Sequence, residues 1–254
     1  MPNMNISFNG ATLSRPGAYE ADQSTGVNPN PALPVPPLVF VGYSYGGEPG
    51  VPYNSSADYL VGACEASLRR LGVEQVDLLQ VHRPDLLAHP EQVARAFDVL
   101  YRAGKIRAAG VSNYTAAQTR ALLGYLAMPL ASLQPEFSAL ALDPLSDGIL
   151  DLALERGIAV LAWSPLGQGR LAGAGADERS ARVIAALDAI AARTGITRSA
   201  VAYAWVMTHP ARPIPLVGAQ LPAHIREAAA ACRVELTRAD WYRVLEASRG
   251  ARMP

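Results

Sequence analysis

The chain contains few cysteines and almost no lysine. Cys64 and Cys232 are its two cysteines, and Lys105 is the single lysine among 22 basic residues. Two cysteines so far apart favour free thiols in a reducing compartment over a disulfide framework, so we expect a cytoplasmic protein. Any mechanism that needs a lysine has one candidate in the whole chain.

An excess of charge and a long apolar run are also missing. The 22 basic and 22 acidic residues cancel, which leaves no electrostatic footprint for nucleic acid or an anionic membrane. No apolar run approaches the roughly 20 residues of a transmembrane helix, and the first ten residues lack the features of a secretory signal. We therefore expect neither a nucleic-acid nor a membrane partner. What the chain has is 50% hydrophobic residues, enough for a large core.

Residues 1–37 differ from the remainder of the chain. They hold seven prolines, which remove backbone donors and restrict their neighbours. The sequence predicts an irregular N-terminal arm, with a short hairpin around Asn9-Gly10 as an open alternative. Residues 38–254 are predicted to form the folded domain.

From residue 38 onward, short apolar runs alternate with amphipathic segments. Strands are predicted at 38–44, 76–82, 106–112, 130–137, 158–164 and 213–219. Helices are predicted at 58–71, 90–103, 115–124, 145–156, 180–193, 198–208, 222–231 and 237–248. This alternation is typical of βα units around a parallel sheet. No GxGxxG follows an early strand, and the length suits a TIM-type (β/α) barrel, but only about six of the eight units are recognisable. The predicted fold class is therefore α/β, an incomplete TIM-type barrel.

Barrel enzymes place their chemistry where strands end. The polar side chains at the predicted strand ends supply an imidazole, several amides and hydroxyls, and an indole. They form no Asp, His and Cys cluster at metal-ligand spacing, and no GxSxG motif, which excludes a metal site and a serine hydrolase. Each has an ordinary alternative: His82 as a satisfied polar group, Trp163 as a core aromatic, Ser112-Asn113 as a helix cap or turn.

Four motifs, in order, resemble the aldo-keto reductase family. They are SLRRLGVEQVDLLQVHRPD (67–85), GKIRAAGVSNYT (104–115), LQPEFS (133–138) and AWSPLGQGRL (162–171). The tail, with PLVGAQ and LTRADWYRVLEA, is similar to a bacterial NADPH-dependent branch of that family. The resemblance covers about residues 38–250 and corresponds to the third to eighth βα units, with the first two missing.

The resemblance implies an oxidoreductase that reduces a small aldehyde or ketone with NADPH. His82 matches the histidine that hydrogen-bonds the substrate carbonyl, and Trp163 the aromatic that stacks on the nicotinamide. The family's remaining cofactor contacts fall on Ser112, Asn113 and Gln134 for the carboxamide, Ser164, Leu166 and Gly167 for the pyrophosphate, and Gln220, His224 and Glu227 for the adenosine 2′-phosphate. The family usually has arginine where His224 stands, so NADH stays open as an alternative.

The catalytic acid of the family is not found. Its tyrosine and aspartate belong to a DxAxxYG motif that this chain lacks, and Gly42 or Tyr43 stands where its lysine belongs. Lys105 begins a strand, at the opposite end of a barrel. A positioned acid contributes about 10²–10⁴ in rate, so we expect slow turnover, with Tyr43 or Tyr45 as the replacement acid.

Two alternatives to an active reductase follow from these losses. One is a non-catalytic protein that binds the nicotinamide cofactor or a partner, and the other is the product of a truncated gene. Missing strands would also leave open sheet edges at 38–44 and 213–219, through which two copies could pair into a homo-oligomer.

Overall fold

A computed structural model describes residues 7–8, 11–12, 40–43, 53–173 and 177–254. The chain divides into two compact units, and each is considered by itself. The first unit comprises residues 1–112 and 117–131, and the second comprises residues 113–116 and 132–254. The predicted boundary at residue 37 lies outside the described residues and stays a prediction.

The N-terminal hairpin is confirmed by its two short strands. β1 (Ser7–Phe8) and β2 (Ala11–Thr12) pair antiparallel, with Ser7 opposite Thr12 and Phe8 opposite Ala11. The remainder of the predicted arm lies outside the described residues.

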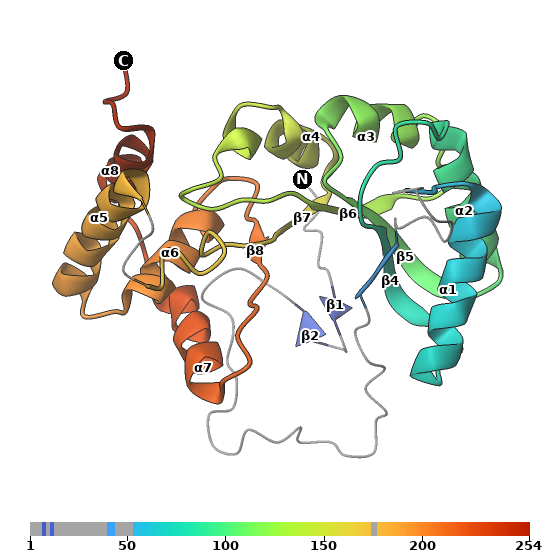
Figure 1. Ribbon diagram of the computed structural model, residues 1–254, viewed down its shortest axis with the longest axis horizontal. Coiled ribbons are helices and arrows are strands. Elements are labelled where there is room, and N and C mark those ends of the chain that lie inside the picture. Colours follow the sequence, from blue (N-terminus) through green and yellow to red (C-terminus); the bar gives the residue numbers. More distant parts are fainter. Residues whose placement is uncertain (1–6, 9–10, 13–39, 44–52, 174–176) are drawn as a thin grey trace. The chain divides into compact units, whose positions relative to one another are not determined.

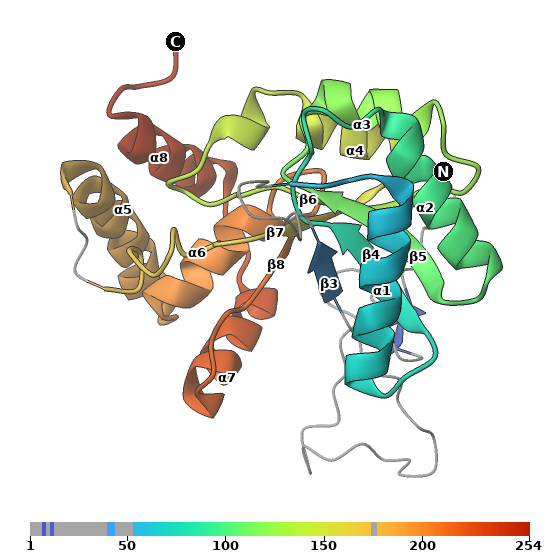
Figure 2. The same cartoon turned by 45° about the vertical axis from the view of Figure 1, so that its right-hand side comes forward.

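Three parallel strands and their helices form the first unit (Figures 1 and 2). The strands are β3 (Phe40–Tyr43), β4 (Val76–Val81) and β5 (Ile106–Ser112), paired in that order. The helices α1 (Ala57–Leu71) and α2 (Pro90–Arg102) lie side by side. α3 (Ala116–Leu123) begins at the boundary with the second unit, and β6 (Leu130–Gln134) crosses it.

Local chemistry sets the ends of these helices. α1 ends at Gly72, which adopts φ 67° and donates its N–H to the carbonyls of Leu68 and Arg69, as glycine does after a helix. α2 begins with Pro90, whose missing N–H costs nothing in the first turn, and His89 Nδ1 accepts from Glu91 N. The predicted helices 58–71 and 90–103 are therefore confirmed to within a residue.

The second unit continues the alternation of strands and helices. Its parallel strands are the end of β6, β7 (Ala159–Ala162) and β8 (Ile214–Pro215). Its helices are α4 (Ile149–Arg156), α5 (Glu178–Thr194), α6 (Arg198–Met207), α7 (Pro222–Ala230) and α8 (Arg238–Arg249), with short 3₁₀ turns η1 (Asp143–Leu145) and η2 (Ala231–Arg233). Among the residues described, no helix is both long and apolar enough to cross a membrane.

Some predicted elements are shorter in the structure. β6 stops at Gln134, because Pro135 has no N–H for the ladder, and β8 keeps two of its seven predicted residues, between Pro213 and Leu216. The helix predicted at 145–156 starts only at Ile149, because Gly148 adopts φ 81°.

Aromatic stacking holds α6 against α8. The indoles of Trp205 and Trp241 stack with 5.0 Å between centroids and 7° between planes. Each indole N–H donates to the other residue's carbonyl, at 3.0 and 3.1 Å. Both indole N–H groups are thereby satisfied.

A capping box begins α8, and its carboxylate also bonds to α5. Thr237 Oγ1 accepts from Asp240 N at 3.1 Å, and Asp240 Oδ2 accepts from Thr237 N at 3.2 Å. The same carboxylate pairs with Arg193 of α5 at 2.7 Å, although its side chain is only 4% exposed. Burial raises the pKa of Asp240, but the bonds from Arg193 and Thr237 outweigh it and leave that pKa below its usual 3.8.

Replacing Asp240 by alanine should lower the free energy of unfolding at pH 7 by about 2 kcal/mol, because the cap and the bond to Arg193 are both lost. A depressed carboxyl pKa stabilises the fold above the unfolded value and loses that effect as pH falls through the folded value. The difference from the parent should therefore shrink below pH 4. Urea unfolding at pH 7 and pH 3 measures both effects.

Glu178→Ala provides the control, because Glu178 pairs with Arg182 at 3.0 Å on an exposed helix surface. That variant should stay within about 0.5 kcal/mol of the parent. Equal stability of Asp240→Ala and Glu178→Ala at pH 7 would contradict the role given to Asp240.

Candidate functional site

The strands of the first unit end at a common edge. The register aligns Tyr43, Val81 and Val111 across β3, β4 and β5, so His82 and Ser112 follow at the same level. Ser112 is buried, and His82 is half-buried. Tyr43 is the last residue of β3. The structure therefore places these three predicted residues at the carboxyl ends of adjacent strands.

The surroundings of His82 favour the neutral form of its ring. Burial and the neighbouring Arg83 guanidinium lower the pKa of His82 from its usual 6.5. A neutral imidazole donates one ring N–H and accepts at the other nitrogen. It can therefore donate a hydrogen bond to a carbonyl oxygen without carrying a charge.

Side-chain hydrogen bonds attach the segment after His82 to the start of α1. Asp85 Oδ2 accepts from Ser55 N at 3.0 Å, and Oδ1 accepts from Leu87 N at 2.9 Å. Gln92 Oε1 accepts from Ala57 N at 3.1 Å. Residues 30 and 35 positions away thus satisfy the N–H group of Ser55, just before α1, and that of Ala57, the first residue of the helix. No local signal in the sequence indicates that Asp85 bonds a backbone N–H group 30 residues away.

Three predicted residues meet in the second unit. Trp163 Nε1 donates to Asn113 Oδ1 at 3.0 Å, and Asn113 N donates to Gln134 O at 3.1 Å. Asn113 follows β5, Gln134 is the last residue of β6, and Trp163 follows β7. Trp163 is half-buried and its indole orients the Asn113 amide, so it is not simply a core aromatic.

Residues with strained backbone conformations lie in and next to this group of Asn113, Gln134 and Trp163. Of the residues described, four that are not glycine have positive φ, and three of them are Asn113 (60°), Ser164 (50°) and Gln168 (58°). Such a conformation costs roughly 1–2 kcal/mol for most residue types, and it recurs at functional sites. The strain here falls on two predicted cofactor residues and on the loop between them and α5.

The loop after Trp163 folds back on itself. Gly167 N donates to Ser164 O at 2.8 Å, and Leu171 N donates to Leu166 O at 3.1 Å. Gly167 has φ 56°, and a Cβ there would lie 2.8 Å from Leu140 Cδ1. Only glycine fits this position without displacing its neighbour.

Leu166 brings this loop to α6 and α7. It packs against a buried cluster from α6, α7 and η2 that consists of Ala200, Tyr203, Ala204, Ala228 and Ala231. Glu227 of α7 is half-buried. The burial of Tyr203 raises the pKa of that tyrosine, and the negative charge of Glu227 raises it further. Gln220 and His224 are exposed at the start of α7, where helix N–H groups favour an anion.

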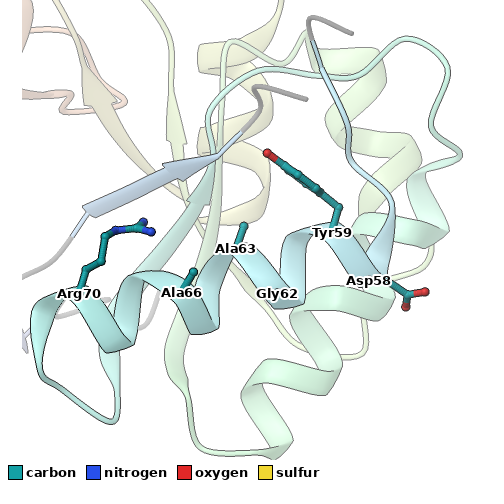
Figure 3. A pocket seen from close by; sticks show the side chains of 6 residues that line it. All are labelled: Asp58, Tyr59, Gly62, Ala63, Ala66 and Arg70. Atoms are coloured by element: carbon teal, nitrogen blue, oxygen red, sulfur yellow. The ribbon is translucent and has the colours of Figure 1, made fainter. Parts of the chain in front are cut away.

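A shallow groove runs along α1 of the first unit (Figure 3). It is lined by Asp58, Tyr59, Gly62, Ala63, Ala66 and Arg70. None of the predicted site residues lines it. In the described ranges, no three His, Cys, Asp or Glu side chains are placed to hold a metal ion.

A protein-family model described as "Aldo/keto reductase family" matches residues 39–249. The chain belongs to the aldo-keto reductase family. It is 49% identical over 206 residues to a 6-dehydroglucose reductase from Novosphingobium aromaticivorans, covering 81% of this chain and 67% of that protein. A protein of the same name from Agrobacterium fabrum is 38% identical over 191 residues, which cover 75% of this chain and 63% of that one.

A solved structure supports the same family. The glycerol dehydrogenase AKR11B4 from Gluconobacter oxydans matches with a TM-score of 0.72 and 27% identity, over 85% of this chain and 72% of that one. The predicted TIM-type (β/α) fold class is confirmed, and so is the predicted family. As an aldo-keto reductase the chain is of the carbonyl-reducing oxidoreductase type, in a family that generally binds NAD(P)H.

The conformation of Asn113 can be tested by comparing two variants. With φ at 60°, alanine is strained and glycine is not, so Asn113→Ala should be less stable than Asn113→Gly by about 1 kcal/mol. Both variants lose the bond from Trp163. Urea unfolding measures the order.

Position 118, inside α3, serves as the control. There Gln118→Ala should be the more stable of the pair by about 1 kcal/mol, since glycine weakens a helix. If alanine is the more stable substitution at both positions, the left-handed conformation assigned to Asn113 is wrong.

Proposed function

We propose that this aldo-keto reductase uses NADPH to reduce a small aldehyde or ketone, slowly, because the family's usual acid is missing. The observation that carries the proposal is the bonded group of Asn113, Gln134 and Trp163, three residues assigned by the family resemblance to the nicotinamide. Bound NADPH would supply the hydride for the carbonyl carbon.

The donor set suits a nicotinamide carboxamide. The group needs both hydrogen-bond donors and acceptors held on rigid strand ends, and Ser112, Asn113 and Gln134 carry both kinds. Trp163 offers a flat indole face for stacking, and its bond to Asn113 fixes the ring. These residues would bind and orient the cofactor.

The phosphates would lie along the folded loop and α7. Ser164, Leu166 and Gly167 would border the pyrophosphate, where Gly167 brings backbone close without a side chain. Gln220, His224 and Glu227 would surround the adenosine 2′-phosphate. Histidine in place of arginine at position 224 weakens the preference for NADPH over NADH.

On the substrate, His82 would donate a ring N–H to the carbonyl oxygen and so orient the carbonyl group. The developing alkoxide then needs a proton. Tyr43 ends β3 but pairs with Val81, whose position lies on the opposite face of the sheet from His82, so the register does not support Tyr43 as that donor. Tyr45 lies outside the described residues. Lys105 is unsuited to help, since its ammonium group pairs with Glu65 of α1 just before β5 begins.

The names of two relatives suggest a substrate class. Both are 6-dehydroglucose reductases, and 6-dehydroglucose is a polyhydroxylated aldehyde. We include such sugar aldehydes among the candidate substrates.

The proposed activity predicts oxidation of NADPH by D-glyceraldehyde and by 4-nitrobenzaldehyde, followed as loss of absorbance at 340 nm. His82→Ala should lower kcat/KM at least about tenfold, because the carbonyl loses its orienting donor. Parent rates no higher than those of His82→Ala would contradict reduction by this site.

A binding measurement separates a reductase from a non-catalytic cofactor-binding protein. NADPH should quench tryptophan fluorescence saturably in the parent and much less in Trp163→Phe, which keeps Trp205 and Trp241. Saturable quenching without turnover would favour the non-catalytic alternative. Absence of quenching would exclude both.

Cofactor preference can be changed at one position. His224→Arg should lower the Kd of NADPH by about tenfold, because one charge-assisted bond to a phosphate adds roughly 1.4 kcal/mol. The Kd of NADH should change less than twofold. Ile225→Arg adds the same charge one residue along α7 and should change neither value. Equal effects on both cofactors would argue against a 2′-phosphate site here.

A further inference from the structure

Gln80 is a polar side chain in an otherwise apolar part of β4. It is 4% exposed, and Val76, Leu78, Leu79 and Val81 of the same strand are buried as well. Its Nε2 is buried and has no hydrogen-bond partner. An unpaired buried amide is destabilising, so the fold alone would be served better by leucine.

The pairing of β4 with β5 shows which side of the sheet Gln80 occupies. Arg107 Nη1 bonds Asp77 Oδ1 at 2.7 Å, which places these two residues on one face. Side chains alternate along a strand, so Gln80 lies on the other face. Continuing the alternation places His82 and Ser112 on the same face as Gln80.

Glycines flank Gln80 on both neighbouring strands. The register pairs it with Gly42 of β3 and with Gly110 of β5. Neither neighbour has a side chain, so no lateral group from these positions pairs with the amide or fills the space beside it. The amide nitrogen therefore suits a small polar partner such as water, which usually satisfies buried groups of this kind.

The spacing suits a bridge to His82. Residues two apart on a strand are about 6.6 Å apart at Cα, and a water molecule joins two polar atoms about 5–6 Å apart. Gln80 Nε2 makes no direct bond to the ring. One water between the amide and the imidazole would satisfy the orphaned donor.

We propose that Gln80 is a positioning residue that acts through His82 by way of one buried water. Nε2 donates to the water oxygen, and the water donates to the nearer ring nitrogen of His82. That nitrogen then carries no proton, so the other ring nitrogen carries the N–H that points to the carbonyl. The inference rests on the proposed contact of His82 with the substrate, but the tautomer itself does not need turnover.

The test compares Gln80→Leu with the parent. The bridging water satisfies the amide in the parent, so replacing it by leucine exchanges hydrogen bonds for apolar packing and should change the melting temperature by less than about 4 °C. At the same time kcat should fall at least about fivefold, with KM within about twofold, because the tautomer is no longer set. A slower enzyme of nearly unchanged stability is the expected result.

The ring ¹⁵N spectrum of His82, assigned with His82→Ala, gives a readout independent of turnover. The parent should show one dominant neutral tautomer, and Gln80→Leu should show a mixture. Leu78→Met changes packing on the same face without a polar atom and should leave the spectrum as in the parent. If the parent proves inactive while the spectra still differ in this way, the proposed function fails and the role of Gln80 stands.

Two results would overturn the inference. One is a Gln80→Leu variant whose His82 spectrum matches that of the parent. The other is a melting temperature that falls by more than about 8 °C, which would make the amide a structural group.

Discussion

Parallel pairing in register is the constraint on which the candidate site depends. Once Val81 is aligned with Tyr43 and Val111, the residues that follow have to emerge at one level, whatever their chemistry. A slip of one residue would move every side chain of a strand to the opposite face. His82 would then point toward the helices, and Gln80 would exchange places with the apolar residues beside it. The fold therefore selects which residues can reach a ligand before their chemistry matters.

The second unit fixes its polar residues by a different means. Asn113 and Ser164 occupy a backbone region that most residue types avoid, and the indole of Trp163 holds the Asn113 side chain. Strain of this kind persists only when the surroundings determine the conformation. Here the surroundings are a backbone bond to Gln134 and the turn from Ser164 to Gly167. The energy lost to strain is offset by side chains that need no reorganisation when a ligand binds.

The parts that the sequence predicts well are those governed by local rules. Thr237 followed by Asp240 is a capping signal, and the structure starts α8 there. The run at 106–112 is apolar throughout and is recovered as β5. Errors appear where a single residue breaks a longer pattern: prolines shorten β6 and β8, and Gly148 delays α4.

Long-range pairing explains what the sequence could not provide. The bonds from Ser55 to Asp85 and from Ala57 to Gln92 join residues 30 and 35 positions apart, and neither partner carries a signal for the other. Strand-end residues such as Asn113 and Trp163 could be proposed from position and family resemblance, whereas the bond between them required the fold.

Gln80 shows how stability and chemistry can be separated in this chain. Gln80 is a polar residue within an apolar run. Its burial and the missing partner of its amide nitrogen show that this residue destabilises the fold unless a water molecule bonds it. Asp240 is also buried and polar, but each of its bonds stabilises the fold, so its presence needs no further reason. A buried polar group that the fold does not satisfy suits a bound water molecule. Because Gln80 and His82 share one face of the sheet, that water would lie beside the His82 ring.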